Sequence, residues 1–168
     1  TKIIGVNAVG GIERSWPPGF IALPDQLIDY TYGREHTFYD GSDGELQHID
    51  FTEPYNPDLR QQLIAAAQQI GLKCSTTGTY AATQGPRLET AAEVRRLHQD
   101  GCDIVGMTGM PEAALAAELG LAYAAVCLVV NAAAGLGEEP ITEAAMHDIL
   151  DNKIGVIGEL LGCWLANL

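Results

Sequence analysis

Three short segments carry the side chains that are best suited to bind a small ligand. They are Thr-Gln-Gly-Pro-Arg-Leu-Glu-Thr (83–90), Gly-Met-Thr-Gly-Met-Pro-Glu (106–112) and Val-Val-Asn (129–131). Each lies where the sequence predicts the end of a buried strand or the start of a helix, and ligands of α/β proteins bind in crevices at strand ends. Together the segments offer a carboxylate, a hydroxyl, a thioether and an amide. Such a set suits a flat heterocycle joined to a sugar.

Two polar residues in these segments each allow a structural and a functional interpretation. Glu89 stands where a strand turns into a helix, so its carboxylate either complements the helix dipole or accepts a hydrogen bond from a ring N–H. Asn131 ends the most apolar strand, where an unpaired buried amide costs about 1–3 kcal/mol. That amide either holds a loop or offers a donor and an acceptor at once, as the N7/O6 edge of a 6-oxopurine requires.

The other candidate residues give weaker signals. Met107 is core filler by default, and Thr108 either caps the following helix or meets an anion at its N-terminus. A predicted loop over 7–11 offers backbone N–H groups, and His48 lies in a polar segment where a surface position is the ordinary expectation. The sequence has no Ser/His/Asp arrangement, P-loop or GxGxxG motif.

The elements that must position these segments alternate between strand and helix. Apolar runs predict strands at 2–6, 20–23, 74–83, 103–106 and 122–130. Capping residues predict helices that begin at Asn56-Pro57, Thr90, Pro111 and Thr142. Continuous apolar strands imply a sheet covered on both faces. We therefore expect an α/β fold with one domain over 1–168, in which helices flank a central mixed β-sheet, and an irregular segment over 32–55.

Composition and charge exclude several classes of function. The chain has 168 residues, 47% of them hydrophobic, and a net charge of −13, which argues against nonspecific binding to nucleic acid or anionic membranes. A small anion can still bind at a local electropositive spot. Cys74, Cys102, Cys127 and Cys163 form no CxxC pair, and we interpret them as buried free thiols. We expect a cytoplasmic protein with no metal site, no signal peptide and no membrane span.

Four stretches resemble the trimeric purine nucleoside phosphorylases, and more narrowly their methylthioadenosine/methylthioinosine phosphorylase branch. They are Gly-Arg-Glu-His-Thr-Phe-Tyr-Asp-Gly (33–41), Gly-Pro-Arg-Leu-Glu-Thr (85–90), Gly-Met-Thr-Gly-Met-Pro-Glu (106–112) and Val-Val-Asn-Ala-Ala-Ala-Gly (129–135). The resemblance covers essentially the whole chain. It implies phosphorolysis of a purine nucleoside to the free base and a sugar 1-phosphate, with inorganic phosphate as co-substrate and no cofactor. It also implies a homotrimer with sites at its interfaces.

The resemblance assigns a role to each site residue. It implies that Asn131 bonds the N7/O6 edge of the purine and that Glu89 accepts from N1–H, which makes these two the catalytic pair. Met107 would pack beneath the ribose, and His48 would reach the 5′ end of a sugar bound in a neighbouring subunit. The substrate-binding set is completed by Leu88, Ala132 and Ala133. Phosphate would contact Asn7, Ala8 and Thr108.

Four positions bear on specificity. The adenosine-specific branch carries Ser where this chain has Glu89 and Asp where it has Asn131, so the pair found here is the 6-oxopurine pattern. Adenine has an unprotonated N1 that would confront the carboxylate lone pair to lone pair. We therefore favour S-methyl-5′-thioinosine as the substrate. At the 5′ end, the branch places an apolar residue where this chain has Glu143, unless the alignment slips so that Met146 lines the pocket.

Members of the family begin with a further stretch that holds a Gly-Gly-Thr-Gly-like phosphate loop and an Arg-His pair. Neither matches this sequence, so we expect the chain to be an N-terminally incomplete form of a longer protein. Four alternatives stay open: a methylthioadenosine phosphorylase, an inosine/guanosine phosphorylase, a hydrolase on the same scaffold, and a non-catalytic purine-binding or interface-forming fragment.

Overall fold

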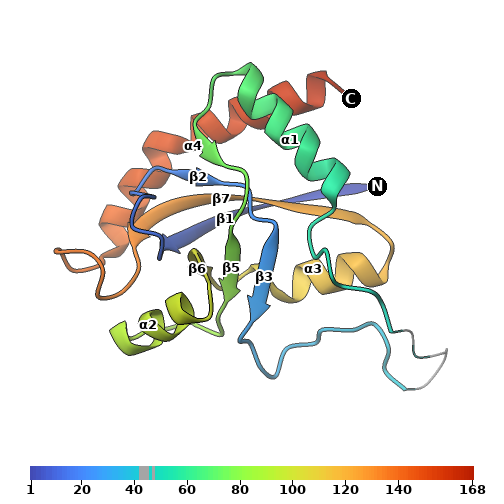
Figure 1. The fold of residues 1–168 in the computed structure, drawn as a ribbon, viewed down its shortest axis with the longest axis horizontal. Helices are drawn as coiled ribbons and strands as arrows, with labels where there is room; N and C mark the ends of the chain where they lie inside the picture. Colours follow the sequence, from blue (N-terminus) through green and yellow to red (C-terminus); the bar gives the residue numbers. More distant parts are fainter. Residues whose placement is uncertain (42–45, 47) are drawn as a thin grey trace.

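A mixed β-sheet forms the centre of the fold in a computed structural model, which describes residues 1–41, 46 and 48–168 (Figure 1). Its strands are β1 (Lys2–Gly11), β2 (Ile21–Ala22), β3 (Gln26–Asp29), β4 (Cys74–Ser75), β5 (Thr79–Ala82), β6 (Ile104–Gly106) and β7 (Ala122–Ala132). They lie in the order β3-β5-β6-β1-β7-β2-β4. Because β1 runs parallel to β7 and antiparallel to β6, the prediction of a mixed sheet is confirmed.

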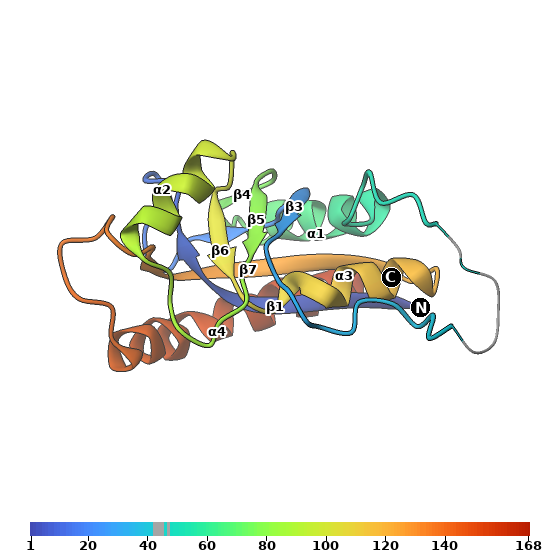
Figure 2. The ribbon, with the colours of Figure 1, turned by 90° about the horizontal axis from the view of Figure 1, so that it is seen from below.

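Helices flank the sheet on both sides (Figures 1 and 2). In the described part of the chain they are α1 (Pro57–Gln69), α2 (Ala91–Gln99), α3 (Gly109–Glu118) and α4 (Glu143–Ala166). α1 and α4 pack together on one face of β7, and α3 packs on the other face. Val94 and Leu97 of α2 pack against Ala81 of β5 and Val105 of β6. These elements form the single α/β body that the sequence predicts.

β7 is buried on both faces, as its continuous apolar sequence predicts. Successive side chains of a strand point to opposite faces. Val126 and Leu128 join the core cluster that includes α1 and α4, whereas Tyr123 and Val129 join the cluster that includes α3. The strand that leads to Asn131 is therefore held between two hydrophobic layers, which fixes the position of its end.

Side-chain caps begin the helices where the sequence predicts them, with one exception. Asn56 caps α1 and Thr142 caps α4, each through a side-chain oxygen that accepts from a backbone N–H three residues further on. Thr90 caps α2 in the same way. α3 is predicted to begin at Pro111, a common first helical residue, but it begins at Gly109 and is kinked between the two.

Two strand predictions are wrong because they depend on contacts that are distant in sequence. Residues 7–11 are predicted as a loop from their glycines, yet β1 continues to Gly11 because it pairs with β7 along its whole length. Residues 74–83 are predicted as one strand, yet a bend at Gly78, whose φ is +149°, separates β4 from β5. A φ of that sign favours glycine, but a glycine alone is also compatible with an unbroken strand.

The segments 21–29 and 74–82 run side by side, and together they curl the sheet. Ile21 of β2 pairs with Cys74 of β4, and Gln26 of β3 pairs with Thr79 of β5. In both pairs the same number of residues separates the two partners in the sequence. These two pairs of strands stand at opposite ends of the strand order. The sheet therefore curls until its two ends come together, although no strand is predicted where β3 lies.

The predicted irregular segment 32–55 has neither helix nor strand over those of its residues that the structure describes. Its first residue, Tyr32, lines a pocket with Arg96 of α2, and the chain then runs toward the end of α3 (Figures 1 and 2). The Glu118 carboxylate at the end of α3 accepts from the Thr37 hydroxyl at 2.6 Å and from the Phe38 N–H at 2.9 Å. These hydrogen bonds lower the pKa of Glu118 and attach the segment to the helix.

Within residues 1–41, 46 and 48–168, no helix is both long and apolar enough to cross a bilayer. The same part of the chain holds no group of three or more His, Cys, Asp and Glu side chains arranged to bind a metal ion. All four cysteines are free thiols. Cys102 and Cys127 are buried, but Cys74 and Cys163 are only partly buried, so the prediction of buried thiols holds for two of the four.

Candidate active site

One pocket brings together most of the residues that the sequence singles out. It lies where β1, β6 and β7 meet the segment that leads into α2, and its volume is about 260 Å³. The predicted site residues that line it are Ala8, Leu88, Glu89, Met107, Thr108, Asn131, Ala133 and Met146. The three segments that are far apart in the sequence therefore converge, as predicted, although β6 runs antiparallel to β1 and β7 and its carboxyl end points the opposite way from theirs.

An irregularity in the β1–β7 ladder directs Asn131. Val9 pairs with Val129, but the next residue of β1, Gly10, pairs with Asn131, so Val130 has no partner opposite it. Such a bulge bends a strand and re-aims the side chains beside it. A Cβ added at Gly10 would lie 3.5 Å from the Asn131 amide nitrogen, so the amide lies over this glycine.

The Asn131 side chain is only partly engaged by the protein. Its amide nitrogen donates to the backbone carbonyl of Ala132 at 2.8 Å. One amide N–H is used in this way, and an amide oxygen that can accept remains. The side chain is half-buried at the wall of the pocket, so it keeps both a donor and an acceptor for a ligand.

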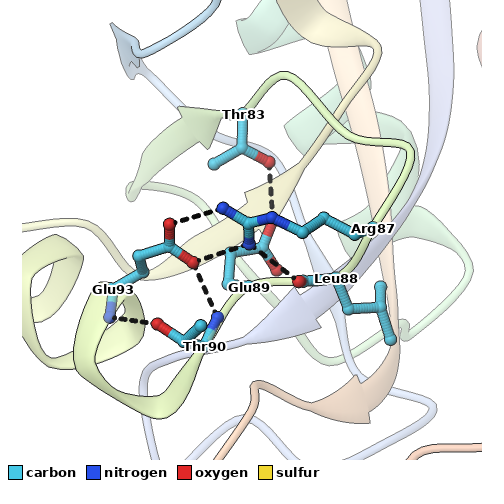
Figure 3. Close-up of polar contacts among 6 residues, drawn as sticks. All are labelled: Thr83, Arg87, Leu88, Glu89, Thr90 and Glu93. Atoms are coloured by element: carbon cyan, nitrogen blue, oxygen red, sulfur yellow. Dashed lines mark hydrogen bonds and ion pairs between the residues drawn. The ribbon is translucent and has the colours of Figure 1, made fainter.

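Thr83, the first residue of the segment 83–90, holds the Glu89 side chain. The Thr83 hydroxyl donates to Glu89 Oε1 at 2.6 Å, so the end of β5 fixes one oxygen of the carboxylate (Figure 3). Oε2 is the oxygen that this hydrogen bond leaves open. Glu89 also borders a neighbouring pocket of about 380 Å³, whose lining includes Arg87 and Arg96. We place the site in the smaller pocket because Asn131, Met107 and Thr108 line that one.

The end of the same segment is fixed by the cap of α2. Glu93 Oε2 accepts from the Thr90 N–H at 2.7 Å, and Thr90 Oγ1 accepts from the Glu93 N–H at 3.1 Å, which is a capping box (Figure 3). Both Glu93 oxygens also accept from the Arg87 guanidinium at 2.8 Å. The Arg87 guanidinium and the Thr90 N–H lower the pKa of Glu93 to about 2. Glu89 therefore sits between two anchored points.

Thr108 and Asn7 meet at the opposite side of the pocket. Thr108 stands at the N-cap position of α3, but its hydroxyl does not cap the helix. Instead, it donates to Asn7 Oδ1 at 3.0 Å. Asn7 is a buried polar residue of β1, and its amide nitrogen lies 3.9 Å from Cys127 Sγ. Burial raises the pKa of Cys127 to about 12, so this neighbour is a neutral thiol.

Glycines allow close packing on the side of the pocket that carries Met107 and Thr108. A Cβ at Gly85 would lie 2.3 Å from Met107 Sδ, so the glycine lets the Met107 side chain reach the segment that carries Glu89. A Cβ at Gly106 would lie 2.2 Å from the hydroxyl oxygen of Tyr80. Tyr80 is fully buried, and its hydroxyl accepts from the Thr108 N–H at 3.4 Å. The backbone before Thr108 is therefore tightly constrained.

Two residues of the α4 region close the pocket on its apolar side. Met146 in the first turns of α4 lines the pocket, as does Ile141, which precedes the helix. Glu143 is exposed and is not among the lining residues. Of the two positions that the sequence left open for the 5′ end, the pocket includes Met146.

Four predicted residues do not line the pocket. Asn7 acts on it through Thr108, and Ala132 through its carbonyl, which accepts from the Asn131 amide. Glu143 is exposed, and so is His48 in the irregular segment. A place for His48 in the site of a neighbouring subunit stays a prediction.

Sequence reasoning did not assign a role to Thr83, although it opens one of the three segments. Its spacing of six residues from Glu89 carries no periodic signal, because the chain between them is a loop. Ile141 also has no predicted role, although an apolar residue just before the Thr142 cap is typical of a hydrophobic staple.

Comparisons with known proteins show the family and the fold of this chain. A model of the phosphorylase superfamily matches residues 1–161. A probable S-methyl-5′-thioinosine phosphorylase of Xanthomonas campestris is 51% identical over 96% of this chain and 65% of its own length. A 6-oxopurine nucleoside phosphorylase of Pyrococcus furiosus is 43% identical over 95% of this chain and 62% of its own length.

A solved structure shares the fold closely. An adenosine/methylthioadenosine phosphorylase of Schistosoma mansoni, a Q289L mutant in complex with adenine, superposes with a TM-score of 0.94 at 29% identity. The superposition covers 99% of this chain and 65% of that chain. The chain thus spans somewhat less than two thirds of the length of the relatives it matches.

Proposed function

This chain belongs to the phosphorylase superfamily, and from that membership we propose that its protein cleaves S-methyl-5′-thioinosine with inorganic phosphate. The products are hypoxanthine and 5-methylthioribose 1-phosphate. The observation that carries this proposal is the presence of Glu89 and Asn131 on the wall of one pocket. Relatives that are 51% and 53% identical are named as probable phosphorylases of this nucleoside.

The reaction exchanges one bond at the anomeric carbon. The bond from C1′ to N9 breaks, and its electron pair leaves with the purine, while an oxygen of hydrogenphosphate bonds to C1′. The proton of hydrogenphosphate ends on the base, which leaves as neutral hypoxanthine. The ribosyl group passes through an oxocarbenium-like state, as in glycoside hydrolysis. The protein has to stabilise negative charge on the departing purine and to hold phosphate in line.

Glu89 and Asn131 divide the recognition of the base. Asn131 donates its remaining amide N–H to O6, where negative charge develops as the purine leaves, and its amide oxygen accepts from N7 once N7 carries the proton. Glu89 accepts from N1–H with the oxygen that the Thr83 hydroxyl does not hold. Adenine offers a lone pair at N1, so it would leave the carboxylate without a donor. The pair therefore selects 6-oxopurines over 6-aminopurines.

The 5′ preference follows from the apolar wall near α4. Met146 and Ile141 line the pocket there, while Glu143 lies outside it. A methylthio group buries apolar surface against such a wall, whereas a 5′-hydroxyl would lose a hydrogen bond to water. A 6-oxopurine nucleoside phosphorylase that takes inosine or guanosine is the second candidate. Relatives that are 43% identical and carry that name favour it.

Phosphate binds on the Thr108 side of the pocket. Thr108 and Ala8 line it, and Asn7 holds the Thr108 hydroxyl. β1 pairs with β6 only at Gly10 and Gly11, so backbone groups of β1 before Gly10 that face this edge have no partner among the described strands. Free backbone N–H groups beside a helix N-terminus suit an anion. No resident cofactor takes part in this proposal.

The assembly that we propose is a homotrimer in the cytoplasm. His48 is exposed, which suits a residue that serves a neighbouring subunit. The four free thiols are compatible with a reducing compartment.

The test uses the protein expressed from its complete coding sequence. S-methyl-5′-thioinosine, S-methyl-5′-thioadenosine and inosine are compared with and without phosphate. We expect phosphate-dependent release of hypoxanthine, fastest from S-methyl-5′-thioinosine. Inosine as the best substrate would favour the second candidate. Cleavage of S-methyl-5′-thioadenosine alone, or product formation without phosphate, would contradict the proposal.

A further inference from the structure

Arg34 joins the two segments that form opposite sides of the pocket. Its Nη2 donates to the carbonyls of Thr83 at 3.2 Å and Gln84 at 3.0 Å. Its Nη1 donates to the carbonyl of Met107 at 2.7 Å and also to the carbonyl of Met110. One half-buried guanidinium thus binds four backbone carbonyls, two from each segment.

The chemistry of these contacts requires an arginine. Four carbonyl oxygens converge on one point, and their partial negative charges repel one another unless a cation lies between them. The guanidinium is always charged and presents five N–H donors in a rigid plane. No carboxylate forms an ion pair with Arg34 in the part of the chain that the structure describes. Its charge therefore acts on the two segments.

Each segment that binds Arg34 also positions a residue that lines the pocket. On one side, the hydroxyl of Thr83, whose carbonyl binds Arg34, holds the Glu89 carboxylate at 2.6 Å. On the other side, Met107, whose carbonyl also binds Arg34, directly precedes Thr108. Arg34 itself is not among the residues that line the pocket.

We propose that Arg34 is a positioning residue, which sets the spacing between the Glu89 side and the Met107–Thr108 side of the pocket. This inference rests on the proposed function. Phosphorolysis needs the base, the sugar and phosphate in line at once, and an error of about 1 Å in such a geometry costs on the order of 100-fold in rate. Arg34 thus sets the geometry of the reaction without touching the substrate.

Arg60 offers a matched control. Its Nε donates to the Pro24 carbonyl at 2.8 Å, and its Nη2 donates to the carbonyls of Leu23 and Thr76. This guanidinium is also half-buried and also binds backbone carbonyls of two segments. It lies on α1, and neither it nor its partners line the pocket. The Arg60→Gln variant therefore measures the general loss of stability when an arginine that joins two segments is removed.

The experiment compares Arg34→Gln, Arg34→Lys and Arg60→Gln in the protein expressed from its complete coding sequence. We measure kcat and KM for S-methyl-5′-thioinosine and for phosphate, together with Tm. We expect Arg34→Gln to lower kcat about 100-fold, with smaller changes in KM. Arg34→Lys should recover part of this loss, because an ammonium keeps the charge but cannot span four carbonyls. Arg60→Gln should lower Tm with little change in kcat.

An equal loss of kcat in Arg34→Gln and Arg60→Gln, or an unchanged kcat in Arg34→Gln, would overturn the inference. Amide hydrogen exchange provides a readout that does not need activity. We expect faster exchange over 83–90 and 106–110 in Arg34→Gln but not in Arg60→Gln. If the wild-type protein cleaves no purine nucleoside, the proposed function fails, whereas equal exchange in both variants would refute the positioning role itself.

Discussion

At the scale of single residues, Glu89 depends on Thr83. A carboxylate that accepts from one ring N–H has to point one of its oxygens at that group. The Thr83 hydroxyl donates to the other Glu89 oxygen at 2.6 Å. A hydrogen bond to a charged acceptor contributes about 1.5–3 kcal/mol when it forms in a protein. The hydroxyl thus restricts the rotation of the carboxylate before the base arrives.

A double-mutant cycle tests this dependence. Glu89→Ala should lower kcat/KM for S-methyl-5′-thioinosine by about 10- to 100-fold, because N1–H of the base loses its acceptor. Thr83→Val should cause a smaller loss in the wild-type background and none in the Glu89→Ala background. Additive losses, measured by steady-state kinetics on the four proteins, would show that Thr83 does not act through Glu89.

Gly106 gives a stability prediction at the same scale. A Cβ at this position would lie 2.2 Å from the Tyr80 hydroxyl oxygen and 2.8 Å from Cζ, and Tyr80 is fully buried, so a shift of its ring would displace core neighbours. Gly106→Ala should therefore lower the free energy of unfolding by about 1–3 kcal/mol. Gly155→Ala is the control, because a Cβ there meets nothing within 4 Å.

On α4, Gly155→Ala should raise the free energy of unfolding by about 0.5–1 kcal/mol. Urea unfolding of both variants checks the pair of predictions. Equal stability of wild-type and Gly106→Ala protein would mean that Tyr80 does not constrain the backbone before Thr108.

At the scale of elements, the start of α2 fixes the segment that carries Glu89. The Thr90–Glu93 capping box and the Arg87–Glu93 pair lie directly after it. The pKa of Glu93 is lowered from 4.5 to about 2, with Arg87 as the largest cause. A carboxylate whose pKa is depressed on folding contributes stability above its unfolded pKa and loses it as pH falls through the folded pKa.

The capping box therefore predicts a pH dependence. The Tm of wild-type protein should exceed that of Glu93→Gln by a constant amount above about pH 5, and this difference should shrink as pH falls toward about 2. Glu159→Gln on the exposed face of α4 serves as the control for removing a carboxylate. A Tm difference that stays unchanged down to pH 2 would contradict the account of the cap.

The elements that could be predicted from sequence are those with local causes. Caps such as Asn56 and Thr142 act within one turn, so the starts of α1 and α4 follow from the residue types alone. The ladder between 21–29 and 74–82 depends on residues about 50 positions apart, so β3 and the break at Gly78 do not follow. The glycines at 10 and 11 suggested a turn, but β7 holds them in a strand.

The sequence predicts the residues that line the pocket better than the contacts that hold those residues in place. Glu89, Met107 and Thr108 follow strands, and Asn131 lies near the end of β7, so the predicted strand ends located all four residues. The contacts that hold them are different, because Arg34 and Thr83 act through loop carbonyls and a side chain–side chain hydrogen bond. No periodicity of the sequence encodes such contacts.

At the scale of the whole molecule, the proposed trimer makes a prediction about mixed subunits. If His48 serves the site of a neighbouring subunit, His48→Ala and Glu89→Ala are each impaired, but in different halves of a shared site. Unfolding the two variants together and refolding them should produce some sites with an intact Glu89 from one subunit and an intact His48 from the next. Activity of the mixture should exceed that of either variant alone.

Sedimentation of the wild-type protein should give the mass of three subunits. A mixture no more active than its components would contradict the shared site, even if the mass is that of a trimer. Mixing the variants without unfolding is the control, because a gain that comes from shared sites requires subunits to be exchanged first.

The central claim is that Glu89 and Asn131 together read a 6-oxopurine, and their exchange tests it most directly. The measurement is the ratio of kcat/KM for S-methyl-5′-thioinosine to that for S-methyl-5′-thioadenosine, in wild-type protein and in the double variant Glu89→Ser/Asn131→Asp. We predict a ratio well above one in the wild-type protein and a fall of at least about 100-fold in the double variant. A wild-type ratio below one, or a ratio that the exchange leaves unchanged, would contradict the account.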